Sequence, residues 1–258
     1  MSTASQKGRQ VHCFQPLKRL LNPTGQHQTL PTILRKDLAR KTMKLVWSPE
    51  TASKAYLDTV KSCRKFKDSG VAEFLSAMAA GWNTKLIVES WSYGSPIATS
   101  VGLAIAANHT CGRHVCVVPD ERSRSSYVEA MKGAGIPSTA VIVGEAEEAM
   151  EGLLGVDFLV VDSKRKDFAR VLRFAKLSHK GAVLACKNAC RRSISGFRWH
   201  WVLERGTRVV RSVFLPVGHG LDIAHIGGDA GVVGSKKNSS RWIKHVDQQS
   251  GEEHFFRG

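Results

Sequence analysis

The sequence predicts an open, mostly parallel α/β sheet with helices on both faces. Three observations predict it: apolar strand-like runs alternate with helical patterns between residues 85 and 186, the strand-like runs are apolar without a break, and glycine closes several helical segments. Alternation at this spacing indicates parallel strands joined by right-handed crossovers. Unbroken apolar runs indicate strands that are covered on both faces.

The elements are expected in the following order. Ser48-Pro49-Glu50 combines a capping serine, a proline at the first helical position and an early acid, which together predict a helix start. A second helix is expected from a cap at Asp68-Ser69 to Gly81. Beyond it we expect strands at 85–89, 114–118, 140–143, 157–161 and 182–186, and helices at 96–108, 123–132, 145–154 and 167–177.

The C-terminal part of the chain completes the predicted sheet. Residues 208–215 and 221–226 flank the turn Pro216–Gly220 and predict an antiparallel hairpin at the sheet edge, which brings the sheet to seven strands. We therefore expect the folded domain at 43–228. Residues 1–42 are expected to be a basic, disordered extension, and residues 229–258 a flexible tail.

Composition and charge restrict the function classes. Apolar residues make up 42% and charged residues 23%, as in soluble globular proteins. No apolar run approaches the roughly 18–20 residues that a membrane span needs, so we expect a cytoplasmic protein without a membrane partner. The net charge is +16, which favours anionic partners. Residues 1–42 are basic and poor in acids, so import into an organelle stays open as an alternative.

The cysteines are expected to be reduced and mostly buried, because they lie largely within apolar runs. They are Cys13, Cys63, Cys111, Cys116, Cys186 and Cys190. Residues 109–116 hold two histidines and two cysteines, but their spacing fits no common zinc module. Core packing is therefore the favoured interpretation of this stretch.

Acidic residues end four of the five predicted parallel strands. They are Glu89, Asp120 with Glu121, Glu145 and Asp162. In open parallel sheets ligands bind beyond the carboxyl ends of the strands, where the strand order reverses. Gly94-Ser95, just before a helix, would let backbone amides approach a carboxylate or phosphate. We expect these groups to line one rim and to leave a nucleoside-sized hollow there.

Residues 70–226 resemble, in the order and spacing of their motifs, the small O-methyltransferases typified by caffeoyl-coenzyme A O-methyltransferase. The motifs are Leu86–Glu89, Glu121–Tyr127 with Ala134–Ile136, Val160–Asp162 and Arg208–Gly220. Residues 43–50 and 117–123 more closely resemble a plant family of unknown function that is usually classed in the S-adenosylmethionine-dependent methyltransferase superfamily. The resemblance implies a Rossmann-like methyltransferase fold, S-adenosyl-L-methionine as cofactor, and a small-molecule or coenzyme A-linked acceptor.

The resemblance also implies roles for particular residues. Glu89 would lie beside the methionine part of the cofactor, Gly94 and Ser95 would form the tight turn, Glu121 or Asp120 would hold the ribose, Glu145 and Ala146 would flank the adenine, and Asp162 would lie under the sulfonium. For each acid the alternative is a solvated strand end or a helix cap.

Two departures from the resembled enzymes concern the site itself. Trp91 stands where those enzymes place a glycine. Lys187 replaces the middle acid of their metal-binding set, which leaves Asp162 and Asn188. One carboxylate and one amide are a poor site for a hard divalent ion, so no metal is expected. We predict instead that Lys187 pairs with Asp162, and that Lys187, Asn188 and Asp162 are the catalytic candidates, Lys187 as base or electrostatic stabiliser.

Three functions therefore stay open. The first is a metal-independent methyltransferase of unknown acceptor, and the second is a non-catalytic protein of the same fold that senses a nucleotide ligand or acts as a scaffold. The third is nucleic-acid binding through residues 191–201, where arginines alternate with aromatic residues. The alternative for that segment is a cover helix whose Phe197, Trp201 and Ile194 pack inward.

Overall fold

The computed structural model describes residues 46–66, 70–136, 139–190 and 197–228, together with the backbone of 242–246 and 253–257. The chain divides into two compact units, residues 1–228 and 229–258. The expected extension at 1–42 lies outside the described residues. The second unit contains an antiparallel pair, β10 (Trp242–Val246) and β11 (Glu253–Arg257), within the range where the sequence predicts a flexible tail.

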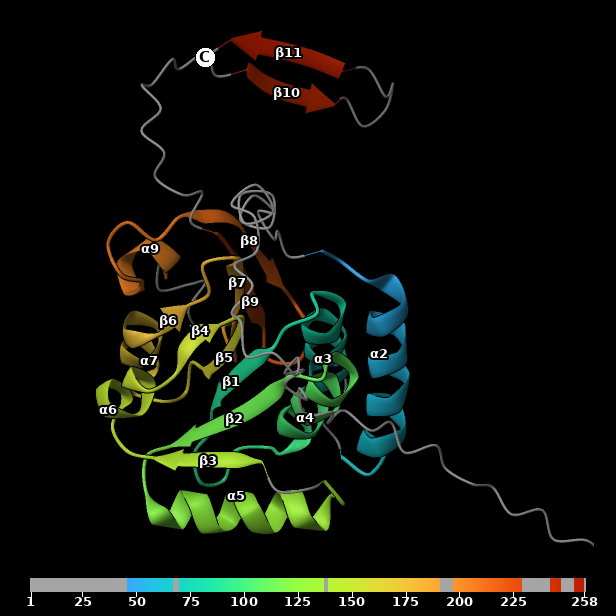
Figure 1. Ribbon diagram of the computed structural model, residues 1–258, viewed down its shortest axis with the longest axis vertical. Coiled ribbons are helices and arrows are strands. Elements are labelled where there is room, and N and C mark those ends of the chain that lie inside the picture. The colour runs from blue at the N-terminus through green and yellow to red at the C-terminus, as the bar shows by residue number, and fades with distance from the viewer. Residues whose placement is uncertain are drawn as a thin grey trace, which may run out of the picture. The chain divides into compact units, whose positions relative to one another are not determined.

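A seven-stranded sheet forms the centre of the first unit, in the order β3-β2-β1-β5-β7-β9-β8 (Figure 1). Its strands are β1 (Leu86–Ser90), β2 (Arg113–Val118), β3 (Ala140–Val143), β5 (Phe158–Asp162), β7 (Gly181–Lys187), β8 (Val209–Leu215) and β9 (Leu221–Gly227). Neighbouring strands are parallel, except that β9 is antiparallel to both β7 and β8. The predicted Rossmann-like methyltransferase fold with its C-terminal hairpin is confirmed.

Helices cover the sheet on both sides (Figure 1). They are α2 (Pro49–Cys63), α3 (Val71–Gly81), α4 (Ala98–Thr110), α5 (Glu121–Gly133), α6 (Ala146–Glu151), α7 (Phe168–Phe174) and the short α9 (Trp199–Val202). The predicted cap of α2 is confirmed, because Ser48 Oγ accepts a hydrogen bond from the amide of Thr51 at 3.4 Å. The expected cap of α3, Asp68-Ser69, lies outside the described residues, and Gly70 at φ 91° precedes that helix.

Two of the predicted helices are too long. Residues 145–154 and 167–177 were both expected to be helical to their ends, but α6 stops at Glu151 and α7 at Phe174. The residues that follow form two very short parallel strands, β4 (Leu154–Val156) and β6 (Lys176–Leu177). Strands of two or three residues are too short to show a periodicity in the sequence. Their pairing is fixed only when α6 and α7 pack side by side.

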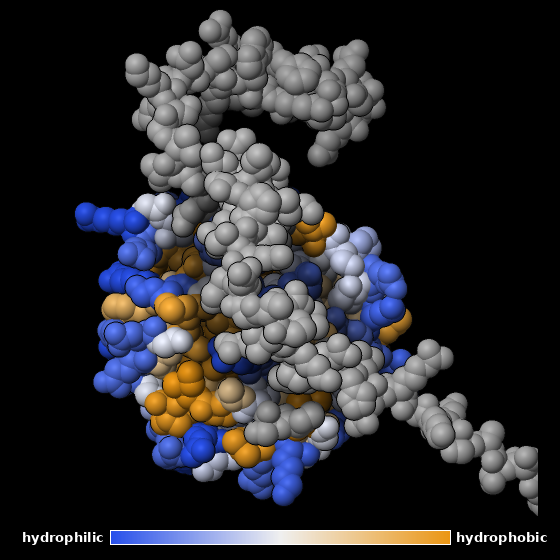
Figure 2. Space-filling view, in the orientation of Figure 1, coloured by the Kyte–Doolittle hydropathy of each residue, from blue (hydrophilic) through white to orange (hydrophobic). Residues whose placement is uncertain are grey.

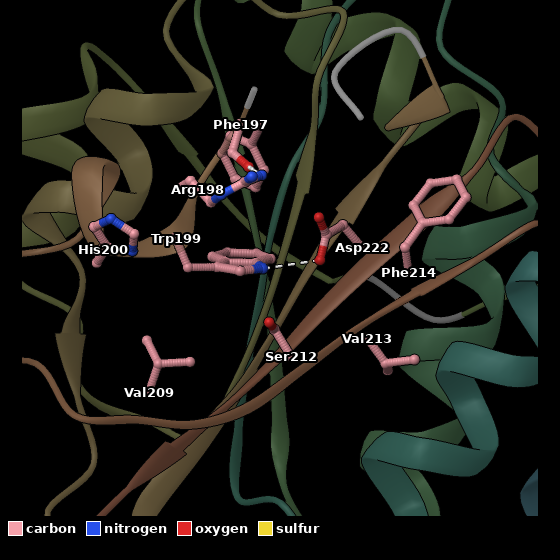
Figure 3. Close-up of a pocket in the computed structure, with 9 residues that line it drawn as sticks. All are labelled: Phe197, Arg198, Trp199, His200, Val209, Ser212, Val213, Phe214 and Asp222. Carbon is pink, nitrogen blue, oxygen red and sulfur yellow. Dashed lines mark hydrogen bonds between the residues drawn. The ribbon is translucent and has the colours of Figure 1, made fainter. Parts of the chain in front are cut away.

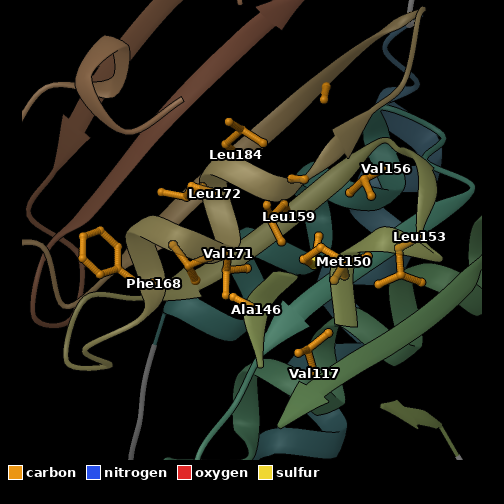
Figure 4. Close-up of a cluster of buried hydrophobic side chains, with 14 of the residues drawn as sticks. Val117, Ala146, Met150, Leu153, Val156, Leu159, Phe168, Val171, Leu172 and Leu184 are labelled. Atoms are coloured by element: carbon orange, nitrogen blue, oxygen red, sulfur yellow. The ribbon is translucent and has the colours of Figure 1, made fainter. Parts of the chain in front are cut away.

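The largest apolar core lies between the sheet and the helices α6 and α7 (Figure 4). Met150 of α6 and Val171 and Leu172 of α7 meet Leu159 and Leu184 of the sheet there. The opposite face of the sheet packs against α3, α4 and α5 in two further clusters. Both faces of the central strands are therefore buried from solvent, which explains their unbroken apolar sequences.

Helices α3 and α4 approach each other at backbone distance. A Cβ built on Gly102 of α4 would lie 2.7 Å from the carbonyl oxygen of Ala72 in α3, whereas a Cβ on Gly133, the last residue of α5, would meet nothing within 4 Å. We expect Gly102→Ala to lower the free energy of unfolding by about 1–3 kcal/mol, because the helices must separate. Gly133→Ala, the matched control, should raise it by roughly 0.5 kcal/mol. Urea denaturation of both variants checks this, and equal effects would contradict the close approach.

Figure 2 shows hydrophilic and hydrophobic residues on the described part of the surface. The hydrophilic residues lie mostly around its rim, and hydrophobic ones gather on the side of α6. Among the described residues, no helix has both the length and the hydropathy of a membrane-spanning segment.

Candidate cofactor and acceptor site

The carboxyl ends of the parallel strands lie together at one edge of the sheet. From β1 the chain builds outward through β2 and β3 on one side, and later through β5 and β7 on the other. The strand order therefore reverses between β1 and β5. Ligands of open α/β sheets bind beyond the strand ends at such a point.

A cavity of about 300 Å³ opens at this edge, beyond the ends of β5 and β7. Its walls come from strand ends, from the beginnings of α3 and α4, and from the turn between β8 and β9; they are Val71, Pro96, Thr99, Asp162, Lys164, Lys187, Asn188, Gly218, His219 and Gly220. The three catalytic candidates, Asp162, Lys187 and Asn188, are all among them. The structure thus brings this part of the predicted site together.

The glycines of the β8–β9 turn allow it to close the cavity. Gly220 has φ 87°, and a Cβ there would lie 2.6 Å from the backbone nitrogen and Sγ of Cys190. The amide of Cys190 donates to the carbonyl of His219 at 3.1 Å, and that of Ala189 donates to the carbonyl of Gly220 at 2.9 Å. Only glycine fits this close, left-handed position.

The predicted ion pair between Lys187 and Asp162 is wrong. The two residues are partners in the β5–β7 register, but no ion pair joins them among the described residues. Asp162 Oδ1 instead accepts hydrogen bonds from Asn188 Nδ2 at 2.8 Å and from the amide of Lys164 at 2.9 Å. The turns after the two strands supply these donors, so the carboxylate is satisfied without the ammonium group.

Glu89 lies inside the molecule, with only 1% of its surface exposed. Its Oε1 accepts a hydrogen bond from the hydroxyl of Tyr127 at 3.0 Å. Nε2 of His114 lies 3.2 Å from the same oxygen, an ion-pair distance, although the ring is not aligned for a hydrogen bond. The carboxylate therefore belongs to a polar cluster beneath α4 and α5, defined here as Glu89, His114 and Tyr127.

The cluster holds Glu89 in its charged form. Burial by itself raises the pKa of this carboxyl, but the close imidazole of His114 and the charge of Lys187 outweigh burial and leave the pKa lowered. Burial and the neighbouring Glu89 charge raise the pKa of the Tyr127 phenol far above its usual value. Tyr127 is therefore a neutral donor to a charged acceptor.

Trp91 does not enter the cavity. Its indole is 2% exposed and packs edge-on against Tyr127, with ring centroids 5.4 Å apart. The loop that follows makes the predicted tight turn: Gly94 has φ 79°, and the amide of Ser95 donates to the carbonyl of Ser92 at 3.0 Å. A Cβ at Gly94 would meet nothing within 4 Å, so the backbone there is open to an approaching ligand.

The predicted ribose-binding acids lie at the start of α5. Asp120 caps that helix by accepting a hydrogen bond from the amide of Ser123 at 2.7 Å. This bond, with a smaller contribution from the Ser123 hydroxyl, holds the pKa of the Asp120 carboxyl below its usual range. Glu121 is exposed and pairs with Arg124 one turn further on, at 3.1 Å. Glu121 is thus the more available of the two.

The predicted adenine-binding residues lie at the start of α6. Ala146 is buried in the core, whereas Glu145 is exposed and pairs with Arg170 of α7 at 3.1 Å. Glu147 contacts the same guanidinium. Neither Glu145 nor Ala146 lines the cavity at the ends of β5 and β7.

Arg165 is a structural residue of this edge that sequence reasoning missed. It is 7% exposed, and its Nη1 donates to the carbonyl of Trp91 at 2.6 Å. Its Nε donates to Asp167 Oδ1 at 2.8 Å. Arg165 therefore ties the loop after β1 to the loop after β5. An Arg-x-Asp pair in a loop was the only signal in the sequence.

A second cavity, of about 330 Å³, lies between α9 and the β8–β9 hairpin (Figure 3). Trp199 is buried, and its Nε1 donates to Asp222 Oδ1 at 2.9 Å. Burial raises the pKa of Asp222 in spite of this bond. Trp201, expected to pack inward, is 66% exposed, so that expectation is wrong and Trp199 takes its place. Phe197 does pack against the core as expected.

The cysteine expectation is confirmed in part. Cys63, Cys116 and Cys186 are free and buried, and Cys190 is free but exposed. Cys111 is disulfide-bonded, which corrects the expectation of reduced thiols throughout. Of the residues between 109 and 116, His114 and Cys116 lie in β2, whereas His109 contacts Asp58 of α2 at 3.0 Å. His109 thus has different surroundings from His114 and Cys116.

The sheet order, the hairpin and the position of the cavity define the class: an α/β protein of Rossmann-like methyltransferase fold. The model of a family described as "Protein of unknown function (DUF1442)" matches residues 43–258. The chain belongs to this family. No curated protein matches it.

Solved structures similar to the chain include several methyltransferases. One is a methyltransferase from Geobacter sulfurreducens, with 20% identity over 76% of this chain and 97% of that chain and a TM-score of 0.49. Another is the O-methyltransferase TomG from Streptomyces achromogenes in complex with S-adenosylmethionine, with 22% identity, 75% and 96% coverage and a TM-score of 0.47. A third, from Staphylococcus aureus, is provisionally described as a caffeoyl-CoA O-methyltransferase, with 14% identity, 76% and 98% coverage and a TM-score of 0.49.

Proposed function

We propose that this protein is a metal-independent methyltransferase that binds S-adenosyl-L-methionine along the carboxyl edge of the sheet. The observation that carries the proposal is the cavity beyond the ends of β5 and β7, next to the reversal of strand order, with Asp162, Lys187 and Asn188 in its walls. About 300 Å³ is at the lower end of the range for small-molecule pockets, so it suits a compact acceptor group.

The residues present fit the cofactor in part. Glu121 is exposed at the start of α5 and is able to leave Arg124 for a ribose, and the open backbone at Gly94 suits the methionine end. Asp162 would lie near the sulfonium. Glu89 does not fit its implied role, because its carboxylate is already engaged inside the Glu89–His114–Tyr127 cluster.

Methyl transfer makes modest demands on the protein. The methyl group passes from sulfur to the acceptor in an in-line displacement, so the chain has mainly to hold the two reactants together and exclude water. Lys187 lies in a largely buried position where its charge would stabilise an acceptor that loses a proton. The acid of the resembled metal site is absent at this position, which supports transfer without a divalent ion.

Titration calorimetry of the full chain with S-adenosylmethionine and S-adenosylhomocysteine tests the binding. We expect both to bind, and Glu121→Gln to weaken binding about tenfold or more, since a carboxylate accepting ribose hydroxyls is lost. Glu129→Gln, an exposed acid on the same helix, is the matched control and should leave the affinity unchanged. Absence of binding at millimolar ligand would end the proposal.

A methyl-release assay tests the chemistry. With caffeoyl-coenzyme A as probe acceptor, we expect transfer that EDTA does not reduce. The engagement of Glu89 inside the Glu89–His114–Tyr127 cluster favours a second candidate, a non-catalytic protein that senses a nucleoside ligand. Cofactor binding without methyl release to any small phenol or coenzyme A ester would support that second function. We also expect the protein to act in the cytoplasm or, if residues 1–42 direct import, in an organelle.

A further inference from the structure

Lys187 carries a positive charge into the wall of the cavity at the ends of β5 and β7. It is the last residue of β7, it is 7% exposed, and it lines the cavity at the ends of β5 and β7. Within the part of the chain that the structure describes, its side chain makes no hydrogen bond or ion pair, although its charge acts on Glu89. Its Nζ is not among the described polar atoms that are fully enclosed without a partner, so the ammonium group keeps access to the cavity. A largely buried ammonium group beside an open cavity favours an anion that binds from outside the chain.

The other walls of the cavity favour a negatively charged occupant. Lys164 and His219 are exposed at its rim. Asp162 is the one carboxylate among the lining residues, and its Oδ1 already accepts two hydrogen bonds. Two ammonium groups thus face a single carboxylate that is itself held by donors.

The beginning of α4 adds donors on the opposite wall. Pro96 and Thr99 line the cavity, and α4 starts between them at Ala98. The helix has no side-chain cap, so its first amides have no intrahelical acceptor, and Thr99, the second residue of the helix, lines the cavity. The start of a helix of 13 residues also carries a partial positive charge.

We infer that this cavity binds an anionic group, a carboxylate or a phosphate, of a small molecule. The anion pairs with Lys187 and accepts hydrogen bonds from the first amides of α4 and from Asn188. Lys164 draws the ligand in from the rim. That this anionic molecule is the methyl acceptor rests on the proposed function. That the cavity binds an anion does not depend on it.

The test is titration of the full chain with inorganic phosphate and, separately, with malonate, at constant ionic strength and without S-adenosylmethionine. We expect one of the two anions to bind with one-to-one stoichiometry, which identifies the group. Lys187→Gln should weaken that binding at least tenfold, and Lys164→Gln several-fold. Lys166→Gln, an exposed lysine of the same loop outside the cavity, is the matched control and should leave binding unchanged.

The inference is overturned if neither anion binds, or if Lys166→Gln weakens binding as much as Lys187→Gln, since the effect would then be one of net charge. If Lys187→Gln does not fold, Lys164→Gln decides, because that residue is exposed. Anion binding without cofactor binding would keep this site and end the methyltransferase proposal. Cofactor binding with methyl transfer but without anion binding would keep the methyltransferase proposal and end the proposal of an anion site.

Discussion

Replacing Arg165 by methionine should destabilise the domain by about 3–5 kcal/mol at neutral pH, because it leaves a half-buried carboxylate and a buried carbonyl without their donor. The carboxylate is that of Asp167, 2.8 Å from Arg165 Nε, and the carbonyl is that of Trp91, 2.6 Å from Nη1. Urea denaturation followed by tryptophan fluorescence measures the effect. The loop after β1, which Arg165 holds through the Trp91 carbonyl, should also loosen, and under the proposed function S-adenosylhomocysteine should bind more weakly.

The matched control is Arg170→Met. Arg170 also bridges carboxylates, those of Glu145 and Glu147, but on the surface, where water and salt screen the pairs. We expect little change in its melting temperature. If the two variants lost equal stability, the contacts of Arg165 would contribute no more than a surface ion pair.

The Arg165 effect should shrink in acid. Burial raises the pKa of Asp167, but the hydrogen bonds and charge of Arg165 outweigh burial and leave the pKa below its ordinary value of 3.8. The stabilisation is therefore fully present above pH 3.8 and is lost as the pH falls through the lower folded value. Unfolding curves of the wild type and R165M should converge over that range.

Replacing Glu89 by alanine should cost about 3 kcal/mol or more, because the Tyr127 hydroxyl and the charge of Lys187 lose their buried counterpart. Tyr127→Phe removes only one donor and should cost about 1–3 kcal/mol. Chemical denaturation of both variants checks the order. A Tyr127→Phe loss that exceeds the Glu89→Ala loss would contradict the central place of the carboxylate in the cluster.

Glu89→Gln separates charge from shape. Since the folded pKa of Glu89 lies below its ordinary value of 4.5, its charge stabilises the fold above that pH and ceases to do so as the pH falls through the folded value. The wild type should therefore lose more stability than E89Q when acidified below pH 4.5. Parallel losses would show that Glu89 is already protonated in the fold.

Part of the candidate site was visible in the sequence. Asp162, Lys187 and Asn188 follow adjacent parallel strands, and parallel strands end at one edge, so their meeting in one cavity followed from the strand pattern. The partner of each group did not follow from it. Asp162 takes Asn188 and a backbone amide instead of Lys187, because the choice depends on the geometry of the turns that follow the two strands.

The sequence by itself determined the alternation of strands and helices, the cap at Ser48 and the closing hairpin, because these follow from local periodicity and backbone preference. Only the tertiary structure decided that Glu89 turns inward to Tyr127, that Trp91 is covered, and that Arg165 ties two loops together. The local sequence around an acid at a strand end is the same whether a helix covers the acid or a ligand binds to it. What covers it depends on how α4 and α5 pack, and that packing joins residues far apart in the chain.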